Sequence, residues 1–368
     1  MQKFKLRSFI LILVSIFFIS LSLKYDVAIE LVYTNVVNKF FREKLSLLFG
    51  HTSIPIGDIL MLLLIILTIV LLVRLVLSIF SPKKIFSNIA KTIFLIINIS
   101  AIFLFLFVAL YALNYHTRPM QSIIVDKYNR KYSTNVKIDV TKDKKMEIFY
   151  FLNDKIKENK KLISSESNKF VDKDINGFSK ELNVGYNAIS DIFPNLEGEY
   201  SSPKKSLYSS VFNNFGLDAI YHIYTNEVSI NDNIPRIYKP YIMAKYMAYQ
   251  RGVAREDEAL FTAFLATSNS TNVEVQYSGY LSMLNLLVES TKIKDRVTYN
   301  EMLSKIDDNT KKDLNEIKRY KLQYGQGKFI KDQICVYYKR INGDLRSTDL
   351  SIQTIDILSI YYSLFSYK

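Results

Sequence analysis

The side chains best suited to chemistry gather between Tyr221 and Leu281 of this 368-residue chain. Imidazole, carboxylate, amine and phenol groups recur in this stretch, and such groups bind metal ions or exchange protons in many protein sites. They belong to His222, Glu227, Lys245, Tyr246, Tyr249, Glu256, Glu258, Tyr277 and Tyr280. If the fold brought some of them together, they could line a cleft for a polar ligand or hold a metal ion.

The sequence does not support other common catalytic arrangements. It contains no Gly-x-Ser-x-Gly elbow and no glycine-rich phosphate loop. Cys335 is the only cysteine, which excludes an intrachain disulfide and a cysteine-based metal site, and its helical surroundings predict a buried side chain. The other histidines, His51 and His116, lie next to predicted membrane segments, away from the stretch above.

The charge distribution argues against nucleic acid as a partner. The formal net charge is +13, and it divides into +7 for residues 1–116 and +6 for residues 117–368. A nucleic-acid site would concentrate the positive charge in one patch. The spread instead suits a surface near anionic lipid or cell-wall polymer.

The elements that must position these side chains begin with a membrane region, residues 1–116. Apolar runs predict spans at about residues 8–23, 59–80 and 93–113, and an amphipathic helix at the membrane surface, or packed under the domain, at about residues 26–50. The first run is followed by Lys24-Tyr25-Asp26 and not by a cleavage site, so we expect a retained anchor.

Basic residues at the N-terminus and between the second and third spans predict that this side faces the cytoplasm. The chain would then be a multi-pass membrane protein, and residues 117–368 would form its extracytoplasmic domain. Arg74 lies inside the second span, about two turns from its end, where its side chain can reach the headgroups.

Residues 117–368 are predicted to be mostly helical, with a small β element. Pro240 and Gly252 fit the start and the end of one helix, and two further helices are expected at about residues 255–267 and 273–290. Helical patterns also run from Tyr299 to Ile341 and from Thr348 to Leu364. The best strand candidates are residues 135–140 and 226–231.

The stretch from Lys245 onward resembles a bacterial membrane family, domain of unknown function 3810, proposed to be zinc metallopeptidases. Its members show H-E-x-x-H-Q-R-G, then R-E-D-E-A, then Y-S-G-Y-L. The present chain keeps the flanks in register: Gln250-Arg251-Gly252, Arg255-Glu256-Asp257-Glu258-Ala259 and Tyr277-Ser278-Gly279-Tyr280-Leu281. The three spans are similar too, so the resemblance covers essentially the whole chain. It implies a zincin-like domain with two motif helices packed side by side.

The chain departs from the family at the motif itself. Lys245 and Tyr249 stand where the family has the two zinc-binding histidines, and Tyr246 stands where it has the glutamate that activates water. By resemblance, the third ligand corresponds to Glu256, with Glu258 as second choice. A surviving carboxylate alone cannot hold a catalytic zinc, which needs about three protein ligands. We therefore expect no zinc or other cofactor, and we expect Lys245 to pair with Glu256 or Glu258.

The sequence thus predicts a catalytically inactive pseudo-metallopeptidase, a peptide- or protein-binding or regulatory module of the cell envelope. Its remnant cleft would draw on Glu256, Glu258, Glu227, His222, Tyr277 and Tyr280, with the tyrosines as an aromatic floor. Two alternatives stay open. One is an active membrane peptidase with relocated ligands, for which His222, Glu227 and Glu256 would have to converge. The other is a transport accessory protein, suggested by the three spans and Arg74.

Overall fold

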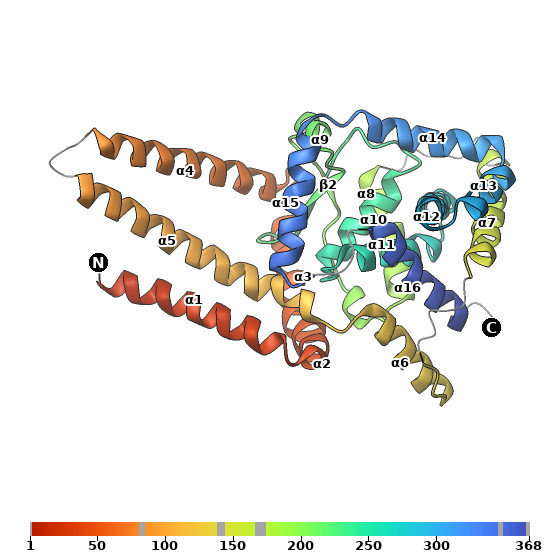
Figure 1. Ribbon diagram of the computed structural model, residues 1–368, viewed down its shortest axis with the longest axis horizontal. Helices are drawn as coiled ribbons and strands as arrows, with labels where there is room; N and C mark the ends of the chain where they lie inside the picture. Colours follow the sequence, from red (N-terminus) through yellow and green to blue (C-terminus); the bar gives the residue numbers. More distant parts are fainter. Residues whose placement is uncertain (1, 81–84, 138–143, 166–173, 345–348, 366–368) are drawn as a thin grey trace.

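Long apolar helices extend from one side of a helical domain. The computed structural model describes residues 2–80, 85–137, 144–165, 174–344 and 349–365. The extending helices are α1 (Gln2–Ser22), α4 (Ile56–Ile79) and α5 (Ile85–Leu110), and α5 packs against both of the others (Figure 1).

Two of these helices could cross a bilayer. Among the described residues, α4 and α5 are each long and apolar enough, and α1 adds a third span if it is counted with residues 26–50 as one span bent by 107°. The chain is therefore a membrane protein by composition, with two or three candidate spans. The predicted spans at residues 59–80 and 93–113 correspond to α4 and α5, and the run at residues 8–23 falls almost entirely within α1.

Residues 26–50 are helical, as predicted. Their polar side chains face the protein and their apolar side chains face outward, the reverse of a helix on the surface of a soluble protein. They form α2 (Asp26–Ala28), a wider π-helical stretch (Ile29–Asn38) and α3 (Lys39–Gly50). The buried positions, four residues apart, are polar: Glu30, Thr34, Asn38, Arg42 and Ser46. The exposed positions are apolar and include Val32, Val36, Phe40, Phe41 and Leu48. The helix thus packs its polar face on the protein and turns its apolar face outward.

The core of the domain surrounds α11 (Glu256–Ser268), whose residues from Asp257 to Thr267 are all buried. Four helices pack against it: α8 (Ile175–Ala188), α10 (Lys239–Gln250), α12 (Val273–Lys294) and α16 (Leu350–Phe365). The helices α6 (Met120–Tyr132) and α7 (Lys145–Ser165) cover α16 and α12. The predicted helices around residues 240–252, 255–267 and 273–290 are therefore confirmed.

The helical pattern from Tyr299 to Ile341 is divided in the structure. It forms α13 (Arg296–Lys305), α14 (Asp308–Leu322) and α15 (Gly327–Ile341). Asp295 and Asp307 cap the first two, because each carboxylate accepts hydrogen bonds from the first free backbone amides. Short 3₁₀ helices occupy Ala112–His116 and Pro194–Leu196.

A small sheet lies between the apolar helices and α10. It contains β1 (Lys204–Lys205), β2 (Ala219–His222) and β3 (Glu227–Ile230), in the order β1-β3-β2, and the helix α9 (Ser209–Phe215) precedes β2. The strands β2 and β3 form an antiparallel hairpin, whereas β1 is parallel to β3. The predicted strand at residues 226–231 is β3. Of the other candidate, residues 135–137 are not in a strand, and residues 138–140 lie outside the described residues.

Candidate functional site

A cleft of about 590 Å³ lies between α10, the start of α11, β2 and α15. The helix α10 contributes Lys245, Tyr246 and Tyr249, and α11 contributes Glu256. Opposite them, α15 contributes Lys331, Cys335, Tyr338 and Lys339 among other residues. Lys245, Tyr246 and Tyr249 therefore face a cleft and not the interior of the domain. Cys335 was predicted to be buried, but it is exposed because it lines the open cleft.

An ion-pair cluster occupies the centre of this cleft. The Lys245 Nζ atom lies 2.7 Å from Glu256 Oε1, and the Lys339 Nζ atom lies 2.8 Å from Glu256 Oε2. The predicted pairing of Lys245 with a neighbouring carboxylate is therefore present, with Glu256. The Lys245 ammonium also lies over the rings of Tyr246 and Tyr249, 5.5 and 6.0 Å from their centroids.

The cluster fixes the charges of its members. Burial alone would lower the pKa of Lys245, but the Glu256 carboxylate, together with Tyr249 and Tyr246, outweighs that effect and raises this pKa well above its ordinary value. Burial would raise the pKa of Glu256, yet Lys245 and Lys339 together lower it to about 2. Both oxygens of the Glu256 carboxylate are thus already bound by ammonium groups.

His222 and Glu227 lie elsewhere, at the junction between the sheet and α4. The His222 Nε2 atom lies 2.8 Å from Asp58 Oδ1 and 3.0 Å from Ser229 Oγ. Glu227 is fully buried and accepts hydrogen bonds from the Gly57 and Ile56 amides at the first turn of α4. Within the described ranges, no three His, Cys, Asp or Glu side chains are grouped so that they could hold a metal ion.

Glu258 also faces away from the cleft and holds the linker between α5 and α6. Its Oε1 atom accepts hydrogen bonds from the Met120 backbone amide and from Arg255 Nε. The Arg255 guanidinium in turn donates to the backbone oxygens of Tyr115, Thr117 and Arg118. These two residues therefore fasten the membrane region to the domain.

The Gln250-Arg251-Gly252 flank has a similar structural role. The Gln250 amide donates to Ser46 Oγ of α3 and to the Asn226 carbonyl. The Arg251 guanidinium is stacked between Tyr186 and Tyr200, 4.4 and 4.5 Å from the ring centroids. Gly252 has a φ of +85°, and a Cβ atom there would lie 1.7 Å from Arg42 Nη1. Gln250, Arg251 and Gly252 thus position α10 against the polar face of residues 26–50.

The aromatic lining of the cleft differs from the expected set. Tyr277 hydrogen-bonds to Asp313 and borders a separate small cavity, and Tyr280 packs against Phe151 and Phe264. Beside Tyr246 and Tyr249, the tyrosines that do line the cleft are Tyr111, Tyr115, Tyr221, Tyr324 and Tyr338. They come from segments up to 227 residues apart, so only the fold could group them.

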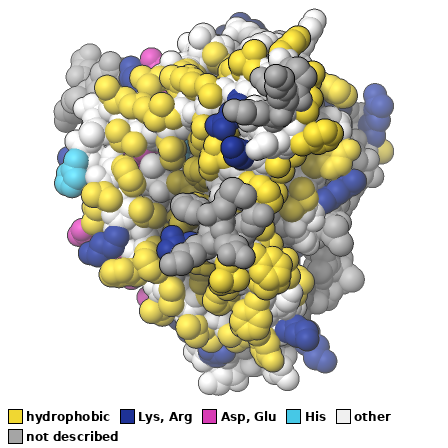
Figure 2. All heavy atoms as spheres, turned by 90° about the vertical axis from the view of Figure 1, so that its left-hand side faces the viewer, with side chains coloured by type: hydrophobic (Ala, Val, Ile, Leu, Met, Phe, Trp, Pro, Cys, Tyr) yellow, Lys and Arg dark blue, Asp and Glu magenta, His cyan; other side chains and the backbone are white. Residues whose placement is uncertain are grey.

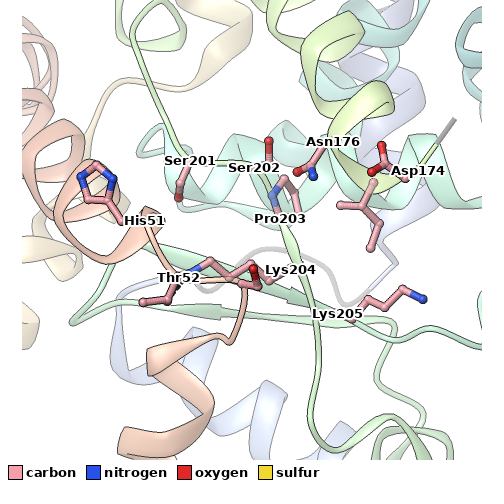
Figure 3. Close-up of a pocket in the computed structure, with 12 residues that line it drawn as sticks. His51, Thr52, Asp174, Asn176, Ser201, Ser202, Pro203, Lys204 and Lys205 are labelled. Atoms are coloured by element: carbon pink, nitrogen blue, oxygen red, sulfur yellow. Dashed lines mark hydrogen bonds between the residues drawn. The ribbon is translucent and has the colours of Figure 1, made fainter.

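A second cavity, of about 420 Å³, lies at the end of α3 (Figure 3). His51 stands at one end of it and Asp174 at the other. The Lys204 Nζ atom donates to the Phe49 and Ile54 carbonyls and to Glu227, and Asp174 caps α8. The charged groups of Lys204 and Asp174 in this cavity are therefore engaged in structural contacts, and the first cleft is the better candidate site.

The fold and the cleft define a membrane protein that carries a mainly helical domain with a charged, tyrosine-lined cleft. The family described as protein of unknown function (DUF3810) matches residues 33–343, and the chain belongs to this family. The match includes α4, α5, the sheet and the whole cleft. Comparison with curated proteins and with solved structures gave no match.

Proposed function

We propose that this chain is a membrane-anchored pseudo-metallopeptidase whose cleft binds an extended peptide and does not cut it. The observation that carries the proposal is the Lys245–Glu256 ion pair in the cleft between α10 and α11. In an H-E-x-x-H site, the metal lies between a helix with two histidines one turn apart and a carboxylate on the following helix. Lys245 and Tyr249 are one turn apart on α10, and both line the cleft that Glu256 borders.

The ion pair replaces what a metal would do for the fold. A zinc ion would neutralise the Glu256 carboxylate and link the two helices, and the Lys245 ammonium supplies both functions. An ammonium at a ligand position repels a second cation, and a phenol at the other position is a poor ligand at neutral pH. These substitutions remove hydrolysis by the zinc route but leave the shape of the cleft.

The strand β2 offers a surface on which a peptide could bind. It is an edge strand, and consecutive residues from Gly216 to Tyr221 line the cleft, as expected if the open edge of the strand faces it. The Asp218 carbonyl accepts a hydrogen bond from the Asn231 amide, so Asp218, Ile220 and His222 direct their backbone groups toward β3. Ala219 is buried, whereas the partly buried Tyr221 directs its backbone groups toward the open edge, where an added strand could pair.

The membrane topology belongs to the same proposal. The basic N-terminus, Lys83, Lys84 and Lys91 support a cytoplasmic location for the far ends of the apolar helices. The domain then lies outside the cytoplasm, and its peptide partner comes from an envelope protein. Arg74 is exposed on α4, which suits contact with headgroups, and it gives no support to a transport pathway.

Metal analysis and backbone exchange test the proposal on the purified full chain in detergent. We expect no stoichiometric zinc and no cleavage of a panel of ten-residue synthetic peptides. With a peptide from the panel that binds, the Tyr221 amide should become protected from hydrogen exchange. The Ile220 and His222 amides, which already face β3, serve as the internal control and should change little.

Two results would contradict the proposal. Stoichiometric zinc that is lost in Glu256→Gln, together with peptide cleavage, would establish an active peptidase. Peptide binding that protects a different surface and leaves the Tyr221 amide unchanged would refute the edge-strand mode of binding.

A further inference from the structure

The helix α15 forms one wall of the cleft and leaves an apolar face uncovered. The side chains of Ile330, Ile334, Tyr337 and Ile341 are between 56% and 83% exposed. Their spacing of four, three and four residues places them on one side of the helix. The opposite side carries Lys331, Cys335 and Lys339 and lines the cleft. An apolar stripe of this size on a soluble surface would be unusual, so it indicates a contact surface.

The position of α15 relates this stripe to the candidate spans. The ring of Tyr338 lies 6.1 Å from that of Phe107, which is three residues before the end of α5. Gly327, at the other end of α15, packs against Phe215 of α9. Just before α9, the Leu207 amide donates to Asp58 in the first turn of α4. The helix thus runs across the domain ends of α5 and α4 (Figure 1).

The surroundings of the stripe are apolar and basic. On the face that carries the apolar helices, hydrophobic side chains predominate, with Lys and Arg side chains among them (Figure 2). Exposed Leu207 and Val211 extend the apolar surface beside α9. Within α15, four cations (Lys328, Lys331, Lys339 and Arg340) accompany a single anion, Asp332. That anion pairs with Lys328 and Lys331, and Lys339 pairs with Glu256, so the helix keeps a net positive charge.

This combination fits a bilayer surface better than a second copy of the chain. An amphipathic helix with a cationic polar face buries its apolar face at the boundary between headgroups and acyl chains, and its cations attract anionic lipid. A second copy would bring the same positive charge toward the stripe, and like charges oppose such an interface. The bilayer that α4 and α5 cross would meet α15 without any rearrangement of the domain.

We infer that α15 is an interfacial helix that rests in the headgroup layer of an anionic membrane and forms the lipid-side wall of the cleft. A ligand in the cleft then lies about one helix diameter, roughly 10 Å, from the lipid. This inference concerns the lipid contact of α15 and holds whether or not the cleft binds a peptide.

Tryptophan fluorescence tests the contact, because the chain contains no tryptophan and each introduced one is the only such probe. Ile334→Trp and Ile330→Trp place the probe on the stripe. Val297→Trp is the matched control, since Val297 is 80% exposed but belongs to α13 at the far end of the domain (Figure 1). The full-length variants are reconstituted in vesicles of phosphatidylcholine and phosphatidylglycerol, with and without bromine on the upper acyl chains.

We expect brominated lipid to reduce the fluorescence of both stripe variants roughly twofold and to leave Val297→Trp unchanged, since an interfacial helix inserts its apolar face about 5–10 Å into the boundary region. Equal, unquenched emission from all three variants would overturn the inference. Unquenched emission from the stripe variants, with crosslinking between copies at position 334, would overturn it in favour of self-association.

Discussion

Removing the Glu256 carboxylate should destabilise the domain in a pH-dependent way. In the folded chain, Lys245 and Lys339 lower the pKa of Glu256 from 4.5 to about 2. This difference corresponds to roughly 3 kcal/mol of stability, and because the side chain is about a quarter exposed, solvent screening reduces it to about 2 kcal/mol. We therefore expect Glu256→Gln to lower the free energy of unfolding at pH 7 by about 2 kcal/mol.

The direction of the pH dependence follows from the lowered pKa. The unfolded chain binds a proton at Glu256 more readily than the folded chain, so the contribution is complete above about pH 4.5 and is lost as the pH falls toward 2. At pH 3, the difference between the native chain and Glu256→Gln should be about half of its value at pH 7.

Urea denaturation in detergent micelles, followed by circular dichroism, measures these differences. Glu274→Gln is the matched control. Its partner Arg236 is 44% exposed, so loss of the pair should cost at most about 1 kcal/mol at any pH. A difference for Glu256→Gln below about 0.5 kcal/mol at pH 7, or one that does not shrink at pH 3, would refute the reasoning.

Two further predictions concern the contacts that join the membrane region to the domain. Gly252→Ala should lower the free energy of unfolding by about 2 kcal/mol more than Gly343→Ala does. Both glycines have a positive φ, but only at Gly252 would the new Cβ atom collide with Arg42. Denaturation of both variants measures the difference, and equal losses of stability would contradict the prediction. Glu258→Ala should accelerate hydrogen exchange of the Met120 amide at least tenfold, because that amide loses its hydrogen-bond acceptor. Unchanged protection would show that contacts other than the Glu258 hydrogen bond hold the linker.

Features that depend on nearby residues could be predicted from the sequence. The spans α4 and α5 and the helices α10 and α11 follow from local periodicity. The Lys245–Glu256 pair was predictable too, since a lysine and a glutamate on consecutive helices are only 11 residues apart.

Features that depend on distant residues could not. Local pattern shows that residues 26–50 have two faces, but the buried face is polar because Thr34 meets Asn114 and the Arg42 carbonyl meets Asn226. Glu227 was a plausible ligand in the sequence, whereas in the fold it binds the first turn of α4, 170 residues away. Such partners are determined by tertiary packing, which the periodicity of the sequence does not reveal.

The most direct test of whether the cleft derives from a zinc site is to introduce the H-E-x-x-H motif into this chain. The triple variant Lys245→His, Tyr246→Glu, Tyr249→His recreates H-E-x-x-H on α10, opposite Glu256. Zinc titration of the folded, full-length variant should show about one bound ion per chain, lost again when Glu256→Gln is added, while the native chain binds none at that position. A folded triple variant that binds no zinc would contradict the account, since α10 and α11 would then lack the geometry of a metallopeptidase.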